Sequence, residues 1–230
     1  MHPGSPASPG RRVVDLTHVL EDGMVTYPGL PAPAISDWLS WADSATRYAP
    51  GTEFQIGRIE MIANTGTYLD APSHRHRDGD DLAALPLQRV AALDGVVVEA
   101  RERTGPAVDV AMLEDVEVAG RAVLVRTGWD AHWRTERYGG ADAPFLTAAA
   151  AQHLLDRGAA LVGIDALNVD SGADGQRPVH TMLLAAGVPV LEHLTNLGAL
   201  PVDGFELHAA PVPVRGMGTF PVRAYAVLRG

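Results

Sequence analysis

The sequence predicts an α/β protein with a single domain, built on a mixed sheet or a partial barrel. Short β-branched runs such as Gly95–Glu99 and Arg121–Arg126 are typical of buried strands. Between such runs lie Ala-rich segments with apolar residues at helical spacing, such as Phe145–Arg157. Strands and helices do not follow one another as a regular β–α–β repeat, and this irregular order favours a mixed sheet. A chain of 230 residues is within the usual length of one such domain.

The first half of the chain contains few regular elements. Residues 1–11 are rich in Pro and Gly and have no apolar stretch of the signal-peptide type, so we expect a flexible segment followed by one domain over 12–230. Arg12–His18 is expected to form a first strand that runs into a polar turn. Gly23–Ile35 is rich in Pro and Gly and is expected to be mostly irregular. Phe54–Ala63 partly alternates between apolar and polar residues, which predicts a strand.

The second half of the chain is richer in predicted elements. Gly158 is expected to end the helix at Phe145–Arg157, because glycine readily adopts the left-handed conformation that follows many helices. A second helix is expected over Val179–Ala186 and is followed by Gly187, which would end it in the same way. Further strands are expected at Ala159–Asp165, Val188–Glu192, Phe205–Pro211 and Thr219–Leu228.

Composition and charge narrow the classes of function. The chain has no cysteine, which excludes disulfides, thiolate catalysis and cysteine-based metal centres, so any metal must be held by histidines and carboxylates. A net charge of −10 without a Lys/Arg run argues against nucleic acid as a partner. The apolar runs are too short to span a bilayer, so we expect a cytoplasmic protein that stays off the membrane. Serine-hydrolase elbows, phosphate-binding loops, dinucleotide-binding glycine motifs and the H-E-x-x-H zinc motif are absent.

Residues Asn64–His76 hold the densest group of reactive side chains: a carboxylate, two imidazoles, a phenol and three hydroxyls. In an extended backbone Tyr68 and Asp70 share one face, because side chains alternate along a strand. Pro72 then turns the chain and can bring His74 back toward Asp70. A carboxylate and an imidazole placed in this way could ligate a metal, or could form a base with its orienting acid. The structural alternative is a polar loop in which the acid caps a turn and the histidines are solvated.

Three further groups carry weaker signals. His180 and Glu192 lie twelve positions apart, a spacing that allows them to converge, although a lone histidine near a helix start is more often a cap or a core residue. Asp165–Ser171 follows a predicted strand, where α/β proteins place ligands, but turn caps are the stronger interpretation there. Arg126–Trp129 also ends a strand and offers a guanidinium and an indole, either to a substrate or to a packed corner.

In this order, the segments resemble the cyclase family, which includes bacterial metal-dependent kynurenine formamidases and isatin hydrolases. The family signature is H-x-G-T-H-x-D-x-P-x-H, and the corresponding residues in this chain are Asn64, Gly66, Thr67, Tyr68, Asp70, Pro72 and His74. Shorter matches extend the resemblance over nearly the whole chain, at Asp15–His18, Tyr27–Gly29, Arg126–Trp129, Gly163–Asp165, His180–Leu184 and Glu192–Leu197.

The resemblance implies a swivelling β/β/α-type fold that assembles as a homodimer or homotetramer. It also implies a site in which a divalent cation activates water to hydrolyse a small amide, ester or lactone. The positions that match metal ligands are Asp70, His180 and Glu192. Those expected in catalysis are His74 as the base, together with Tyr68 and Asp70. Those expected to bind the substrate are Asn64, Arg126 and Trp129.

Two histidines of the signature are replaced in this chain, by Asn64 and Tyr68. Neutral Asn is a poor zinc ligand and Tyr binds zinc well only as a phenolate, so these replacements should weaken a zinc site. Three functions stay open. The first is hydrolysis of a cyclic or aryl amide, ester or lactone with Mn²⁺, Zn²⁺ or Mg²⁺. The second is a metal-independent cyclase or dehydratase that acts on a small oxo-acid or polyketide-like substrate through Tyr68 and His74, and the third is a catalytically silent binding protein. We rank an active enzyme first, because the other polar positions remain together.

Overall fold

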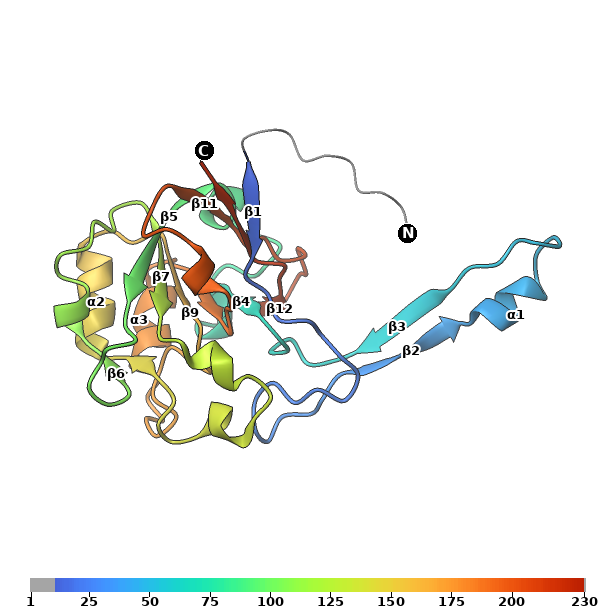
Figure 1. The fold of residues 1–230 in the computed structure, drawn as a ribbon, viewed down its shortest axis with the longest axis horizontal. Helices are drawn as coiled ribbons and strands as arrows, with labels where there is room; N and C mark the ends of the chain where they lie inside the picture. The colour runs from blue at the N-terminus through green and yellow to red at the C-terminus, as the bar shows by residue number, and fades with distance from the viewer. Residues whose placement is uncertain (1–10, 230) are drawn as a thin grey trace.

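The β-branched runs of the sequence form the centre of a nine-stranded mixed sheet in the computed structural model, which describes residues 11–229 (Figure 1). The central strands run parallel, in the order β5 (Leu93–Glu99), β7 (Ala122–Arg126), β9 (Leu161–Ile164) and β10 (Val190–Glu192). Beyond β5 the sheet continues antiparallel with β11 (Phe205–His208), β13 (Tyr225–Leu228) and β1 (Arg12–Asp15). Beyond β10 it continues antiparallel with β4 (Tyr68–Asp70) and β12 (Thr219–Pro221). The expected α/β class with a mixed sheet is confirmed.

The sheet curls, so that the edge formed by β1 approaches the end of β10 in the other half of the sheet. β1 pairs with β13, yet Thr17, two residues after β1, forms a bridge with Leu194, just beyond the end of β10. The Thr17 hydroxyl also donates to the carbonyl of Ala224 at 3.0 Å. In a flat sheet of this strand order, β1 and β10 would lie several strands apart. The expected partial barrel is therefore confirmed as well.

The side chains of the central strands alternate between two cores, one on each face of the sheet. In β7, Val123 belongs to the core beneath the helices, whereas Leu124 belongs to the core on the opposite face. The helices α2 (Ala148–Asp156) and α3 (Pro178–Ala185) contribute to the first of these cores. Because both faces are covered, the central strands read as continuous apolar runs.

Short elements connect the larger ones. They are the 3-10 turns η1 (Pro72–His74), η2 (Leu87–Arg89), η3 (Val110–Met112), η4 (Trp129–His132), η5 (Glu136–Gly139) and η6 (Leu197–Ala199), and the paired strands β6 (Ala107–Val108) and β8 (Phe145–Leu146). β8 shortens the helix expected over Phe145–Arg157. α2 begins only after Thr147, whose hydroxyl accepts from the Ala150 N–H at 3.1 Å, and it is followed by Gly158 with a φ of 76°.

The other expected elements agree with the structure, apart from the two ends of the chain. α3 confirms the helix expected over Val179–Ala186. The last expected strand, Thr219–Leu228, is two strands that pair on opposite sides of the sheet, β12 with β4 and β13 with β11 and β1. Except for Arg11, the flexible segment expected at 1–11 lies outside the described residues. Among the residues that the structure describes, no helix is long and apolar enough to cross a membrane.

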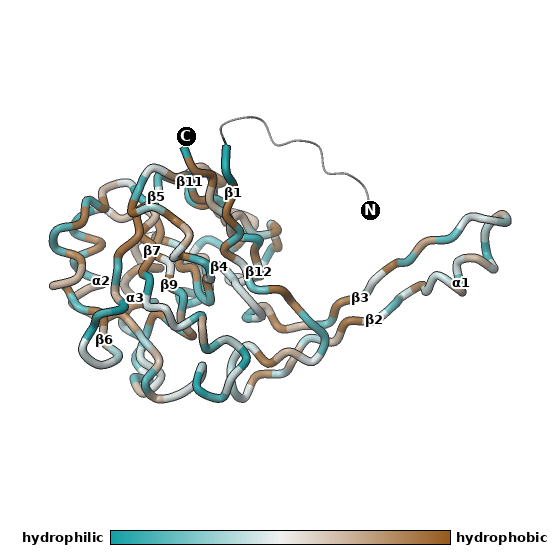
Figure 2. The backbone as a smooth tube through the Cα atoms, viewed as in Figure 1, coloured by the Kyte–Doolittle hydropathy of each residue, from teal (hydrophilic) through white to brown (hydrophobic). Residues whose placement is uncertain are grey.

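An arm formed by residues 34–60 projects from the body (Figure 1). It consists of the antiparallel strands β2 (Ala34–Leu39) and β3 (Ile56–Glu60), with the short helix α1 (Trp41–Ala45) between them in the chain. Figure 2 shows apolar segments along the arm, and large apolar side chains on it are exposed, with Trp38 73% and Ile59 56% accessible. β3 confirms the strand expected within Phe54–Ala63, whereas β2 and α1 are additional to the expected elements.

Candidate active site

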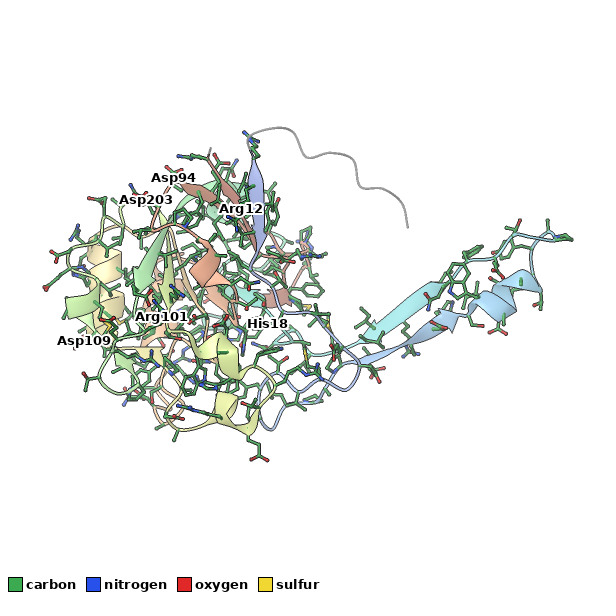
Figure 3. All side chains as sticks on the ribbon, viewed as in Figure 1. Arg12, His18, Asp94, Arg101, Asp109 and Asp203 are labelled. Carbon is green, nitrogen blue, oxygen red and sulfur yellow. The ribbon has the colours of Figure 1, made fainter. Side chains whose placement is uncertain are left out.

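Buried charged side chains mark one region of the body. Many charged residues lie at the surface, as Asp94 and Asp203 do in Figure 3. By contrast, Asp70, His180 and Glu192 are each at most 4% exposed. Charged groups are rarely buried unless they are paired or hold a ligand, so the partners of these three side chains show what the region can do.

Tyr68, Asp70 and Glu192 project from two paired strands toward the same side. The register places Glu192 of β10 opposite Tyr68 of β4, while Leu69, between Tyr68 and Asp70, belongs to the core on the other face. The Tyr68 hydroxyl donates to Glu192 Oε2 at 2.6 Å, and the Val169 N–H donates to Oε1 at 2.7 Å. The shared face of Tyr68 and Asp70 is the one that the period of an extended backbone predicts.

His74 is returned to Asp70 by the 3-10 turn that begins at Pro72. Thr219 of β12, which is paired with Asp70 in the sheet, bridges the two side chains. Its hydroxyl bonds to Asp70 Oδ1 and lies 2.7 Å from His74 Nδ1. A carboxylate only accepts, so the Thr219 proton goes to Asp70 and His74 must donate its Nδ1–H to Thr219. In its neutral form, His74 then carries its lone pair on Nε2.

His180 is oriented by Asp170. Asp170 Oδ1 accepts from the Val179 N–H at 2.7 Å and Oδ2 accepts from the His180 N–H at 3.0 Å, which caps the start of α3. The same Oδ2 lies 2.7 Å from His180 Nδ1. Because Asp170 holds Nδ1–H, the opposite nitrogen Nε2 is turned toward the two other acids, Asp70 and Glu192.

The site carries a surplus of negative charge. Burial raises the pKa of Glu192 to about 7, with Asp70 adding to the rise and His180 opposing it. Burial lowers the pKa of His180, but the charges of Glu192 and Asp70 and the hydrogen bond to Asp170 outweigh burial and raise this pKa to about 10. Burial also raises the pKa of Tyr68 well above its usual value, so its hydroxyl is a neutral donor near pH 7. Carboxylates gathered in this way attract a cation.

The donor atoms fit a divalent cation. Asp70 Oδ2 is buried and has no hydrogen-bond partner within residues 11–229. His180 Nε2 lies 3.5 Å from this atom and 3.5 Å from Glu192 Oε1. Two donors that each bind a tetrahedral ion at about 2.1 Å lie about 3.4 Å apart, so both separations suit an ion held between them. His74 adds a further imidazole, because ligand atoms of Asp70, His74 and His180 all lie within 4.8 Å of one another.

A cavity of about 410 Å³ opens beside these groups. Tyr68, His74, His180 and Glu192 form part of its wall, together with the loop at residues 27–30. Other polar residues of the wall are Asn64, Arg75, Asn168 and Arg177. A cavity of this volume with convergent polar groups has the size and lining of a small-molecule site.

The three residues expected to bind substrate lie in different places. Asn64 lines the cavity, as Tyr68 does. Arg126 pairs with Glu99 at 3.0 Å, and the buried Trp129 donates its indole N–H to the Tyr138 carbonyl at 2.9 Å. Neither Arg126 nor Trp129 is part of the cavity wall, so their role in substrate binding stays a prediction. Their contacts are those of the alternative, a packed corner.

Several residues of the site were not assigned to it by sequence reasoning. For Asp170 the sequence favours a turn cap over a ligand position, and its place ten residues before His180 is the one local signal that links the two. Thr219 has no such signal, because its partner Asp70 is 149 positions away. Arg75 and Arg177 were not singled out, since an isolated arginine in a loop is ordinary.

Comparison with known proteins identifies the family. A family model described as "Putative cyclase" matches residues 14–171, which is more than half of the chain. The chain belongs to the Cyclase family. It is 30% identical to the kynurenine formamidase of Erythrobacter litoralis over 208 residues, covering 89% of this chain and 88% of that protein.

Solved structures of this fold agree with that assignment. Isatin hydrolase A from Ralstonia solanacearum superposes with a TM-score of 0.80 at 25% identity, covering 95% of this chain and 92% of that one. A predicted metal-dependent hydrolase from Bacillus stearothermophilus superposes with a TM-score of 0.74 at 25% identity, covering 95% and 99%. The family resemblance of the signature is thus confirmed, and with it the prediction that the chain is an enzyme of this kind.

Proposed function

We propose that this Cyclase-family enzyme hydrolyses a small aryl amide, cyclic or open-chain, with the help of a divalent cation. The observation that carries the proposal is the convergence of Asp70, His74, His180 and Glu192 beside a cavity of about 410 Å³, whose wall includes the last three of them. One aromatic ring with its amide is of a size that such a cavity can enclose. The names of the relatives, kynurenine formamidase and isatin hydrolase, support amide hydrolysis as the reaction.

Asp70, His180 and Glu192 would hold the cation. Two carboxylates and one imidazole suit Mn²⁺ and Mg²⁺ as well as Zn²⁺, which matters because Asn64 and Tyr68 add no imidazole here. A bound divalent cation supplies Lewis-acid activation of water or of the amide carbonyl. Asp170 keeps His180 in the tautomer that presents Nε2, and the Tyr68 hydroxyl keeps Glu192 in place.

His74 is the general base in this proposal. Thr219 accepts its Nδ1–H, so Nε2 is free to take a proton, and the side chain is 33% exposed. Nε2 takes a proton from the attacking water while the water oxygen bonds to the carbonyl carbon. The carbon–nitrogen bond then breaks and the same proton passes to the leaving nitrogen. The products are a carboxylic acid and an amine, and His74 returns to its neutral form.

The decisive experiment is elemental analysis combined with an assay, on protein purified without chelator or immobilised metal. We expect close to one divalent ion per site and hydrolysis of aryl formamides or isatin-type lactams that a chelator abolishes and Mn²⁺ or Zn²⁺ restores. Turnover that persists without metal would remove the cation and favour acid–base chemistry by Tyr68 and His74. Binding without turnover across the panel would leave a binding protein.

Two variants distinguish the proposed metal ligands from the proposed general base. His74→Ala should keep the metal and lose turnover, whereas Glu192→Gln should lose most of the metal. The reverse pattern would make His74 a ligand, in line with its place in the group of donors within 4.8 Å. Metal content and turnover are measured on the same preparations, and circular dichroism shows that each variant is folded.

We also propose that the chain forms a homodimer or homotetramer with the arm in the interface. Within residues 11–229, β2 and β3 pair only with each other, and the large apolar side chains exposed on them are Ile35, Trp38, Ile56 and Ile59. A lone two-stranded hairpin is marginal in water, and exposed apolar surface of this kind marks interaction sites. Light scattering should give a multiple of the monomer mass, and Trp38→Ser with Ile59→Ser should reduce it. A monomer at micromolar concentration would contradict the proposal.

A further inference from the structure

Two arginines, Arg75 and Arg177, line the cavity close to the site. Arg75 directly follows His74, and Arg177 precedes His180 by three residues. The two segments are tied together, because Arg75 Nε donates to Thr181 Oγ1 at 2.9 Å. Both guanidiniums are therefore held near the two imidazoles that the proposed function uses.

Neither guanidinium forms an ion pair with an acid in the part of the chain that the structure describes. Their hydrogen bonds go to neutral oxygens instead. Arg177 Nη1 donates to Asn168 Oδ1 at 2.7 Å, Arg75 Nη2 donates to the Gln176 carbonyl at 3.3 Å, and the contact from Arg177 Nη2 to the Tyr27 hydroxyl is long, at 3.4 Å. A guanidinium has five N–H donors, so both side chains keep donors for a ligand.

Arg177 has an unusual backbone conformation for a residue with a long side chain. Its backbone is left-handed, with φ 52° and ψ 56°, a region that suits Gly or Asn better. Its side chain is half buried and forms no ion pair among the described residues, although the charges of Glu192 and Asp170 raise its pKa against the effect of burial. A carboxylate in the cavity would be the direct ion-pair partner that this side chain lacks.

Because the protein as a whole is negatively charged, an anionic ligand needs positively charged side chains close to its binding site. A net charge of −10 disfavours the approach of small anions, and the two guanidiniums place positive charge on the cavity wall. A planar guanidinium binds a carboxylate through two parallel hydrogen bonds. The apolar part of the wall, at Pro28 and Leu30, suits the ring of an aryl group.

We propose that Arg75 and Arg177 bind a carboxylate of the substrate, so that the enzyme selects anionic aryl amides. The inference rests on the proposed hydrolysis and adds to it the charge of the substrate. Arg177 is the main anchor because it is half buried, and the exposed Arg75 strengthens the attraction at the entrance. With the carboxylate held there, the amide lies on the side of His74 and His180.

Kinetics on a matched pair of substrates tests the selection. The pair is an aryl formamide that carries a carboxylate and its neutral methyl ester. Arg177→Gln should lower kcat/KM for the carboxylate about 10- to 100-fold, mainly through KM, since charge-assisted hydrogen bonds are of that strength. It should change the value for the ester by less than about twofold, and Arg177→Lys should recover part of the loss. Equal losses on both substrates, or no loss on either, would overturn the inference.

Arg101→Gln is the matched control, because Arg101 is exposed, pairs with Glu99 at 2.7 Å and is not part of the cavity wall. Arg101 is labelled in Figure 3. This variant should change kcat/KM for neither substrate. A loss in Arg101→Gln as large as that in Arg177→Gln would show a general effect of net charge and would also overturn the inference.

Calorimetry separates this inference from the proposed hydrolysis. Benzoate, benzamide and inorganic phosphate are titrated into the wild type and Arg177→Gln. Benzoate should bind more tightly than the other two and should weaken at least about tenfold in the variant. That result supports the carboxylate site even if no amide is hydrolysed. Equal binding of benzoate and benzamide, unchanged benzoate binding in Arg177→Gln, or tighter binding of phosphate would reject a carboxylate site while leaving hydrolysis intact.

Discussion

Asp70 and Asp165 are both buried at strand ends, yet their surroundings differ. Asp165, after β9, accepts from the N–H groups of Thr127 and Gly128 at 2.7 and 2.9 Å, and from the Thr127 hydroxyl at 2.5 Å. Asp70, at the end of β4, has an Oδ2 atom without a hydrogen-bond partner in the described residues and His180 nearby. A buried carboxylate supplied with donors holds the chain together, whereas one with a free oxygen among imidazoles is available to a ligand.

The largest decrease in kcat is expected for the variant Asp70→Asn. The amide would be a weak cation ligand, so kcat should fall about 1,000-fold or more, and the metal content should fall with it. The protein should still melt cooperatively, because the backbone of β4 is held by β10 and β12. Turnover and metal content like those of the wild type would remove Asp70 from the mechanism and end its contrast with Asp165.

Thr219→Val tests whether the surroundings of Asp70 position His74. Valine has nearly the same shape as threonine but cannot accept the Nδ1–H of His74 or donate to Asp70. Loss of such an orienting contact typically costs 10- to 100-fold, and we expect a decrease in kcat of about that size. The metal content should stay near that of the wild type. An unchanged kcat would show that His74 is oriented by other contacts.

Asp165→Ala should show the opposite pattern to Asp70→Asn. The variant leaves the buried N–H groups of Thr127 and Gly128 without an acceptor, which should lower the free energy of unfolding by about 2 kcal/mol. Turnover per folded molecule should change by less than about twofold. Urea denaturation gives the first quantity and active-site titration the second. A large loss of kcat with normal stability would place Asp165 in the chemistry.

His193 extends the comparison of buried ionisable side chains from carboxylates to an imidazole, whose charged form is a cation. Burial lowers its pKa to about 3, so the folded protein leaves it neutral where the unfolded chain, with a pKa near 6.5, takes up a proton. The stability that follows is present above pH 6.5 and is lost as the pH falls toward 3. Between pH 7.5 and 5.5 the loss is about 1.4 kcal/mol.

The variant His193→Gln isolates the contribution of His193 to the free energy of unfolding, because Gln does not titrate. The difference in unfolding free energy between wild type and variant should shrink by that amount when the pH is lowered from 7.5 to 5.5. The comparison with the variant is needed because burial raises the pKa of Asp165 to about 6, which acts on the wild type in the opposite direction. Curves that stay parallel would contradict a neutral buried His193.

The strands and helices of the body could be predicted because their signals are local. β5 and β7 are apolar runs covered on both faces, and α3 is closed by Gly187, which has a φ of 72°. β8 was missed because Phe145 and Leu146 continue the apolar character of α2, and only pairing with β6 distinguishes them as a strand. In the arm, β3 was predicted from its alternation, whereas β2 was missed because nearly all of its residues face solvent and mark no buried side.

The order of residues along the chain was enough to predict the α/β class and the family, and the family resemblance in turn predicted the set Asp70, His74, His180 and Glu192, because each lies in a short segment that matches the family. Tertiary structure alone decided which partners orient them. Thr219 reaches Asp70 across 149 positions, Tyr68 reaches Glu192 across 124, and Arg75 reaches Thr181 across 106. Contacts at such separations depend on sheet order and curl, which no local pattern encodes.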